Sequence, residues 1–225
     1  MAPTTFLTTR PTLAEWVKQL GNLPLERIAA EPFPGTATPH DLLQIRHATG
    51  KLYELVDDTL VEKDMGSPES FLAMELVWRL RSYLAAHDFG FLYGPDALFA
   101  LQPNLIRGPD ISFVPWTRRP EPTVPHEPIS RDIPALVVEI LSPVNTDDEI
   151  QRKIHDYHNA GVELIWIIDP HNQTATVYHA DGTQHALQQN DTLDGAEVLP
   201  GFQLPLPELF ARLQPPANPR PGESS

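Results

Sequence analysis

The sequence predicts an α/β fold with a mixed central sheet, and three observations support this. Two segments, Pro68–Leu84 and Asp147–Ala160, have the spacing of apolar residues that is typical of amphipathic helices. Short apolar segments with strand character lie between these helices, and more follow the second one. Helices and strands in this order pack as a sheet flanked by helices. At 225 residues, 41% of them hydrophobic, the chain can bury one substantial core.

A small helical extension is predicted over residues 1–50. Apolar residues at helical spacing within residues 13–20 predict one short helix, which ends at Gly21. A second apolar cluster at residues 23–28 predicts another short helix. The turn-forming residues at 32–39 predict the loop that joins this extension to the core.

The core opens with a predicted β-hairpin over Tyr53–Glu62. The sequence alternates on either side of Asp57 and Asp58, a pair that suits a tight turn. Ser67 can then cap the first core helix, whose first position is Pro68. The apolar stripe of this helix repeats every four residues: Leu72, Leu76, Leu80 and Leu84.

Strands and a second helix follow the first helix. A proline-rich loop over Pro115–Pro134 separates the last two of three predicted strands, which are Ala97–Leu101, Asp110–Val114 and Ala135–Leu141. The tetrad Thr146–Glu149 fits a capping box, so a helix is predicted from Asp147 to about Ala160, ending at Gly161. Two more strands are predicted after it: Glu163–Asp169 and Thr174–His179.

These elements divide the chain into an extension at residues 1–50, a main domain at 51–213 and a tail at 214–225. The tail is polar and rich in proline, which is typical of a disordered segment. No signal-peptide pattern occurs, and no run approaches the roughly 20 apolar residues that span a bilayer. A soluble, cytoplasmic protein is therefore expected.

The absence of cysteine limits the chemistry of any metal site. It excludes disulfides, thiolate-bound zinc and iron–sulfur clusters, and it leaves carboxylate, imidazole and carbonyl ligands. Hard cations are therefore favoured. His155 and His158 are the closest histidine pair, but they are expected on the exposed side of the second helix, and a zinc site there would need further ligands.

The net charge argues against a broad DNA-binding surface. The chain has 16 Lys+Arg and 30 Asp+Glu, a formal charge of −14, whereas a DNA-binding face is basic. Any contact with DNA must therefore be local, unless the basic residues only make an acidic surface soluble. The candidate contacts are Arg79, Arg81, Arg107, Arg118, Arg119, Arg152 and Lys153.

Glu139 is the first candidate site residue. It is the one charged residue in the predicted strand ALVVEIL, Ala135–Leu141. A buried carboxylate costs several kcal/mol unless it is paired or bound to a metal. The alternative is a structural carboxylate, half solvated at the open end of the strand beside Ser142 and Pro143.

Asp110 is the second candidate and opens the predicted strand DISFV. Pro109 before it favours an extended entry into the strand, and the alternative is an ordinary turn aspartate beside a proline. If this strand and that of Glu139 share a sheet, their ends can bring the two carboxylates together. Like charges at close range repel unless a cation or a shared proton lies between them, so the pair predicts a metal site.

Lys153 is the third candidate. It borders the apolar stripe formed by Ile150, Ile154 and Tyr157 in the second helix, so its side chain can point along the sheet. The alternative is an amphipathic lysine that keeps its ammonium in solvent at the helix border. Arg152 lies about 100° further round the helix and is expected at the surface.

The combined motifs resemble the Uma2 family of restriction endonucleases. The resemblance rests on the hairpin YELVDDTLVE, the segments RGPDISFV and PALVVEILSP, and the spacing Lys153-x-x-x-Tyr157-x-x-x-Gly161 that leads to WIIDP. It covers about residues 50–210, and the order of the motifs is more specific than any one of them. The resemblance implies the PD-(D/E)xK nuclease core, with the element order αβββαβ and a mixed central sheet flanked by helices.

The resemblance also implies particular site residues. Pro109 and Asp110 match the PD half of the motif, and Glu139 matches the acidic member of the second half. Leu141 stands where the core pattern has lysine. This departure points to Lys153 on the following helix as the replacement.

The activity that the resemblance implies is hydrolysis of DNA by a Mg²⁺- or Mn²⁺-dependent endonuclease. Asp110, Glu139 and the main-chain carbonyl of Ile140 would hold the cation, because oxygen ligands suit Mg²⁺. Glu69 resembles a further acidic residue near the start of the first helix, which would ligate directly or through water. Its alternative is a carboxylate favoured by the helix dipole. Lys153 would orient the attacking water or neutralise the charge that develops.

Two other classes of function stay open. The first is a catalytically degenerate nuclease fold that acts as a nucleic-acid- or protein-binding module, which Leu141 and the acidic charge favour. The second is a structural protein in which Asp110, Glu139 and Lys153 form only a buried ion-pair network. For the nuclease, a homodimer would place two basic faces on one DNA duplex.

Overall fold

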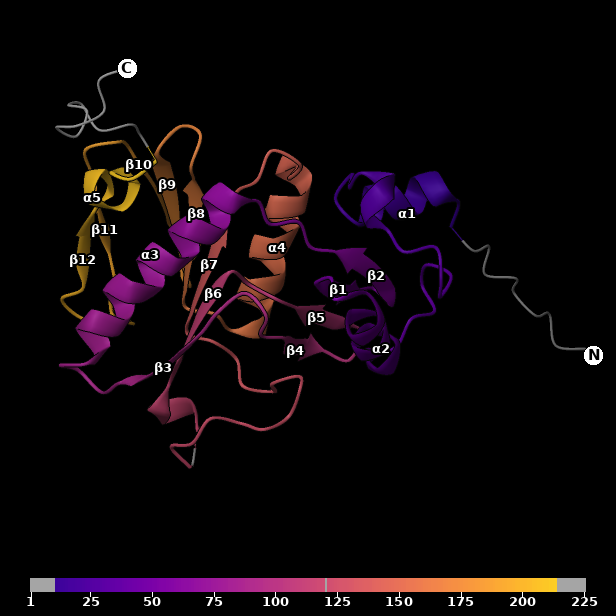
Figure 1. Cartoon of the computed structure of the whole chain (residues 1–225), viewed down its shortest axis with the longest axis horizontal. Coiled ribbons are helices and arrows are strands. Elements are labelled where there is room, and N and C mark those ends of the chain that lie inside the picture. Colours follow the sequence, from indigo (N-terminus) through magenta and orange to yellow (C-terminus); the bar gives the residue numbers. More distant parts are fainter. Residues whose placement is uncertain (1–10, 120, 214–225) are drawn as a thin grey trace, which may run out of the picture.

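The structure is a computed structural model that describes residues 11–119 and 121–213 (Figure 1). Its central sheet has six strands in the order β10-β9-β8-β7-β6-β3, and all neighbours are antiparallel except β7 and β8. The predicted α/β fold with a mixed central sheet is therefore confirmed. The six strands are β3 (Gly90–Tyr93), β6 (Ile111–Pro115), β7 (Leu136–Ile140), β8 (Leu164–Asp169), β9 (Thr174–His179) and β10 (Gln184–Leu187).

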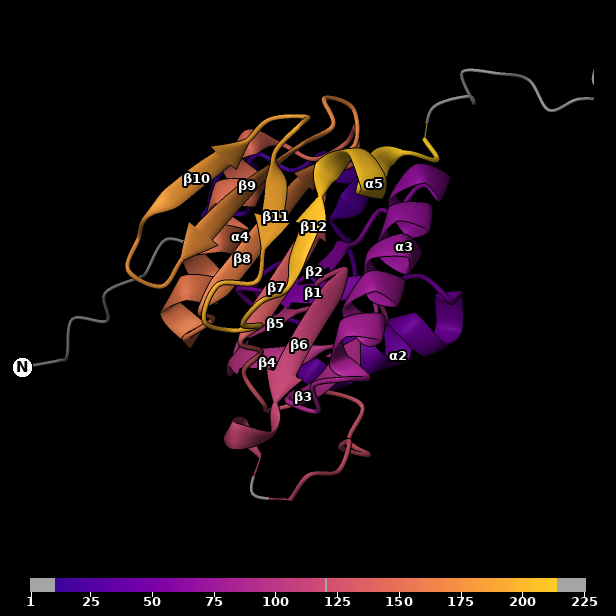
Figure 2. The same cartoon turned by 90° about the vertical axis from the view of Figure 1, so that its left-hand side faces the viewer.

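Two long helices cover opposite faces of this sheet. Helix α3 (Ser67–Leu84) buries its leucine stripe on one face, together with the β11–β12 hairpin (Thr192–Asp194 and Gln203–Pro205) and α5 (Leu206–Phe210) (Figure 2). Helix α4 (Asp147–Ala160) connects the parallel strands β7 and β8 and packs on the other face. The sheet is thus the middle layer between α3 and α4.

A second sheet has four strands in the order β2-β1-β5-β4. Its β1 and β2 form the predicted hairpin, and Asp57 and Asp58 at the turn have φ of 48° and 53°. Two residues with positive φ are what a tight type I′ turn requires. The bounds of the strands are β1 (Tyr53–Val56), β2 (Thr59–Glu62), β4 (Phe99–Gln102) and β5 (Leu105–Arg107).

The strand predicted at Ala97–Leu101 belongs to this second sheet, as β4, and not to the central one. The central sheet instead uses β3, which the sequence pattern did not reveal. A Cβ at Gly90 in β3 would lie 2.2 Å from the carbonyl oxygen of Val114, so that position requires glycine. A four-residue strand that begins with glycine gives little alternation to recognise.

The caps of the two long helices differ from prediction in detail. Gly66, not Ser67, is the N-cap of α3, and no side chain caps it. Thr146 caps α4 as predicted, because its hydroxyl accepts from the amide of Glu149. The capping box is not completed, because the Glu149 carboxylate is held by Arg27 at 2.8 Å.

The first helix of the N-terminal region is confirmed as α1 (Leu13–Gln19), and the second is a single 3-10 turn, η1 (Leu25–Arg27). Helix α2 (Pro39–Thr49) was not predicted, although Thr38 caps it and Gly50 ends it in the left-handed conformation. Its Leu42 packs with β1 and β5, so α2 shares the core that lies beyond the predicted boundary at residue 50.

The predicted disordered tail at residues 214–225 lies outside the described residues. Among the residues that are described, no helix is long and apolar enough to cross a membrane.

Candidate functional site

The pairing of β6 and β7 brings Asp110 and Glu139 to one end of the central sheet. The strands are antiparallel, with Ile111 opposite Val138, so the start of β6 adjoins the end of β7. The Asp110 carboxylate reaches across and accepts from the amide of Ile140 at 2.6 Å. Since side chains alternate along a strand, Asp110 and Glu139 both lie on the face that α4 covers.

Helix α4 brings Lys153 to this pair. The Lys153 Nζ lies 2.9 Å from Oε2 of Glu139, and the hydroxyl of Tyr157, one turn further along α4, donates to Oε1. Lys153 and Glu139 are each 3% exposed. A lysine with its ammonium in solvent and a half-solvated glutamate are therefore both wrong as alternatives, and the three predicted residues do come together.

Glu54 of β1 extends the cluster and was not predicted. One of its oxygens lies 3.8 Å from Lys153 Nζ, and the other lies 2.7 Å from a guanidinium nitrogen of Arg107. Burial by itself would raise the pKa of Glu54, but Lys153 and Arg107 outweigh burial and lower the pKa to about 2. The one sequence signal for Glu54 was that it is a charged residue within the otherwise apolar strand YELV. A charged residue at such a position is equally typical of the exposed side of a hairpin.

Lys63, the residue after β2, is the second residue that sequence reasoning missed. Its Nζ lies 2.7 Å from Oδ1 of Asp110 and donates to the carbonyl of Gly108 at 2.6 Å. Its side chain is 6% exposed. Asp110 thus has Lys63 as its partner, and Glu139 has Lys153.

The pKa values of Glu139 and Lys153 are both raised, for different physical reasons. Burial raises the pKa of Glu139, Lys153 lowers it, and the Asp110 carboxylate raises it again, so that the net pKa is above the ordinary value. Burial lowers the pKa of Lys153, but the carboxylates of Glu139 and Glu54 outweigh burial and raise it. Lys153 therefore stays an ammonium, and burial together with the nearby Asp110 carboxylate keeps the pKa of Glu139 raised despite this partner.

A divalent cation fits the donor chemistry of this pair. Asp110 and Glu139 offer hard carboxylate oxygens at one end of the sheet. The carbonyl of Ile140 lies on the same edge of β7 as its amide, which bonds Asp110, so a third oxygen faces the same place. The described residues contain no group of three or more His, Cys, Asp or Glu that could hold a metal, so water would supply the remaining ligands.

Among the described residues Glu69 forms no group of three potential ligands with Asp110 and Glu139, so ligation by Glu69, directly or through water, stays a prediction. Glu69 lies in the first turn of α3 and lines an open cavity of about 690 Å³ together with Leu141, Ser142 and Asp169. Because Leu141 and Asp169 lie at the carboxyl ends of β7 and β8, this cavity lies at the same end of the sheet as Asp110 and Glu139.

Five of the six arginines predicted to contact DNA, all but Arg81, are engaged by carboxylates of the chain itself. Arg107 is 3% exposed and pairs with Glu54 and Asp156, so its prediction as a surface contact is wrong. The others are less buried, and their carboxylate partners are as follows: Arg79 with Glu75 and Glu208, Arg118 with Glu163, Arg119 with Asp132, and Arg152 with Asp57.

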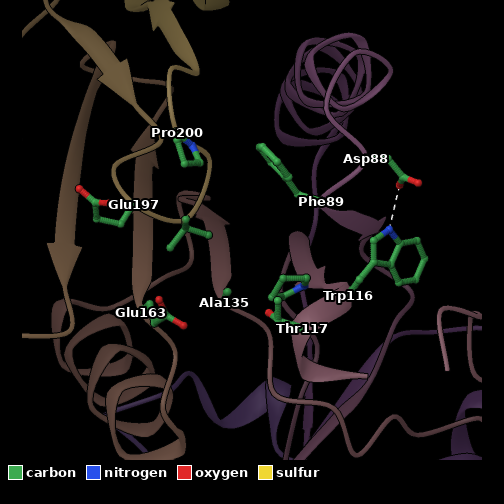
Figure 3. A pocket seen from close by; sticks show the side chains of 10 residues that line it. Asp88, Phe89, Trp116, Thr117, Ala135, Glu163, Glu197 and Pro200 are labelled. Atoms are coloured by element: carbon green, nitrogen blue, oxygen red, sulfur yellow. Dashed lines mark hydrogen bonds between the residues drawn. The ribbon is translucent and has the colours of Figure 1, made fainter. Parts of the chain in front are cut away.

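A second cavity, of about 380 Å³, lies at the opposite end of the sheet, where Ala135 leads into β7 and Glu163 into β8 (Figure 3). The side chain of Glu197 also lines it, and Asp88 accepts from the indole of Trp116 at 2.8 Å. Three carboxylates make this cavity unsuited to the phosphates of DNA. It contains none of the candidate residues.

Comparisons with known proteins identify a family and a shared fold. A model of the Uma2 family, described as "Putative restriction endonuclease", matches residues 39–207. A crystal structure described as "a putative nuclease belonging to DUF820 from Anabaena variabilis" has a TM-score of 0.64 and 22% sequence identity, and the match covers 74% of this chain and 93% of that chain. At this identity the likeness shows a shared fold. A comparison with curated proteins found no match.

Proposed function

Because the chain belongs to the Uma2 family, we propose that it is a Mg²⁺- or Mn²⁺-dependent endonuclease that hydrolyses phosphodiester bonds in DNA. The observation that carries this proposal is the meeting of Asp110, Glu139 and Lys153 at one end of β6 and β7. Three residues from separate segments form one buried site, and the cluster consists of the residue types that metal-dependent phosphodiester hydrolysis uses.

The element order supports a PD-(D/E)xK nuclease core. The central sheet and its two flanking helices follow the chain order α3, β3, β6, β7, α4, β8, while β4 and β5, between β3 and β6, belong to the second sheet. This is the αβββαβ order that the resemblance implied. Leu141 stands in the usual position of lysine, and Lys153 reaches Glu139 from α4 instead.

Each residue has a distinct role in the proposed reaction. Asp110, Glu139 and the Ile140 carbonyl would hold the cation, which would supply a polarised water and a positive charge beside the scissile phosphate. Tyr157 orients Glu139 through its hydrogen bond. Lys153, which stays an ammonium, stabilises negative charge that develops on the phosphate oxygens.

Binding of DNA at the open cavity beside Leu141 is part of the proposal. The acidic net charge requires that contacts be local, and a cation at the carboxylates would invert the potential there. Arg79, Arg118, Arg119 and Arg152 keep a role only if DNA phosphates replace their present carboxylate partners. A homodimer would double the number of such contacts.

A catalytically degenerate nuclease fold that acts as a binding module is the second candidate function. The specific observation in its favour is burial, because Asp110, Glu139 and Lys153 are each 3% exposed. At this burial a phosphodiester reaches the three side chains only if residues that cover them move. The ion pairs then serve stability alone.

Cleavage of DNA separates the two candidates. Supercoiled plasmid and single-stranded DNA are incubated with the protein and Mg²⁺, Mn²⁺ or EDTA, beside Asp110→Ala and Glu139→Ala. We expect metal-dependent nicking that each substitution reduces at least a hundredfold, with Glu197→Ala as a carboxylate control from the other cavity. Equal cleavage by the wild type and both site variants rules out the site, and no cleavage by any folded protein favours the binding module.

A further inference from the structure

The Lys63 ammonium contacts a carboxylate oxygen of Asp110, where a bound cation would lie. The ammonium lies 2.7 Å from Oδ1 of Asp110, while Oδ2 accepts from the amide of Ile140 at 2.6 Å. Both oxygens of Asp110 therefore already have a donor from the chain. The Glu139 oxygens are held by Lys153 and Tyr157 in the same way.

Lys63 and Lys153 are not equivalent in this arrangement. Lys153 lies between Glu139 and Glu54, so it would keep a carboxylate partner if Glu139 turned towards a metal. Lys63 has one carboxylate partner, Asp110, and its other bond goes to the neutral carbonyl of Gly108 at 2.6 Å. Among the residues that the structure describes, Asp110 is the one carboxylate that Lys63 contacts, so a cation that binds Asp110 would remove this counter-charge.

Charge and burial make the two cations compete. An ammonium and a divalent ion that share one carboxylate lie a few ångströms apart, and their repulsion is poorly screened when the lysine side chain is 6% exposed. The carbonyl of Gly108 gives Lys63 a second acceptor, which can keep the ammonium hydrogen-bonded after it leaves Asp110.

We propose that Lys63 is a built-in competitor for the metal: it neutralises Asp110 in the metal-free protein and must withdraw from Oδ1 when Mg²⁺ or Mn²⁺ binds. The inference rests on the proposed function, because it takes Asp110 as a metal ligand. Lys63 is thus the residue that sets metal affinity, and it does so by opposing binding. A lysine that only stabilised the fold would have no such effect.

The test is calorimetric titration of Mn²⁺ into the full-length protein, with no DNA present. Lys63→Met keeps most of the side-chain volume and removes the charge, and we expect it to lower the Kd for Mn²⁺ at least tenfold relative to the wild type. Lys63→Gln should act in the same direction if methionine impairs folding. Lys63→Arg retains the charge and should stay within about threefold of the wild type.

Two controls make the result specific. Lys51→Met removes an exposed lysine that pairs with Glu62, and it should leave the Kd within about twofold. Asp110→Asn should abolish binding in both the wild-type and the Lys63→Met backgrounds, which locates the ion at this site.

The titration distinguishes failure of the competitor role from failure of the proposed metal site. If the wild type binds Mn²⁺ through Asp110 and the folded Lys63 variants bind no more tightly, the competitor role is wrong while the proposed metal site stands. If neither the wild type nor any Lys63 variant binds Mn²⁺, the metal site is wrong and the competitor role falls with it.

Discussion

The two faces of the central sheet bury different chemistry. The face under α3 is apolar throughout, with Leu76 and Leu80 packed against Val138 and Trp166. The face under α4 is apolar around Val137 and then ends in charged side chains that come from β1, β5, β7, α4 and the residues next to β2 and β6. One face of the sheet thus serves stability alone. The other has a charged end whose burial costs free energy. Burial of that kind calls for a functional explanation.

The largest expected effect is a loss of folding stability when one member of the charged cluster is removed. Lys153→Met leaves Glu139 without its cation, and breaking a buried pair in this way costs about 3–5 kcal/mol. Urea unfolding of the wild type and the variant measures the loss. The double variant Lys153→Met/Glu139→Gln should recover part of it, because no unpaired charge remains at Glu139. A single variant as stable as the wild type would contradict the burial of this pair.

A slightly smaller effect is expected on the apolar face. Leu76 is fully buried under α3, and Leu76→Ala should lower the free energy of unfolding by about 2–5 kcal/mol. The same variant should bind Mn²⁺ with the wild-type Kd once folded, because it touches no charged residue of the opposite face. A change in Kd comparable to that of a Lys63 variant would mean that the two faces are not separate.

The smallest expected effect is the contribution of Glu54 to the pH dependence of folding stability. Its pKa is lowered in the folded protein to about 2, so the stability it contributes is present above its unfolded value of about 4.5. That stability is lost as the pH falls from about 4.5 towards about 2. The difference in unfolding free energy between the wild type and Glu54→Gln should therefore shrink over this range. A difference that grows on acidification would contradict the assignment.

The apolar periodicity made most of the fold predictable. The local pattern of apolar and polar residues matches the observed burial in two helices, α3 and α4, and in two strands, β6 and β7. It also does so in the hairpin that turns at Asp57 and Asp58. Strand β3 was missed because a glycine and a short length weaken its pattern. Helix α2 was missed although Thr38 and Gly50 mark both of its ends.

The candidate site was predictable only in part. Asp110, Glu139 and Lys153 stand out because each interrupts or borders an apolar pattern. The resemblance to a family then assigned all three to one site. Lys63 follows a hairpin strand where charged residues are ordinary, and nothing local shows that it reaches Asp110. Arg107 was misjudged for the same reason, because its carboxylate partners lie about 50 residues away in the sequence.

The metal site at Asp110 and Glu139 is the central claim, and anomalous diffraction tests it most directly. Crystals grown with saturating Mn²⁺ should show one anomalous peak where the start of β6 adjoins the end of β7, about 2.1 Å from oxygens of both carboxylates. Lys63 Nζ should then have withdrawn from Oδ1 of Asp110. A well-ordered structure at saturating Mn²⁺ with no peak between these carboxylates, and with Lys63 still on Asp110, would contradict the account.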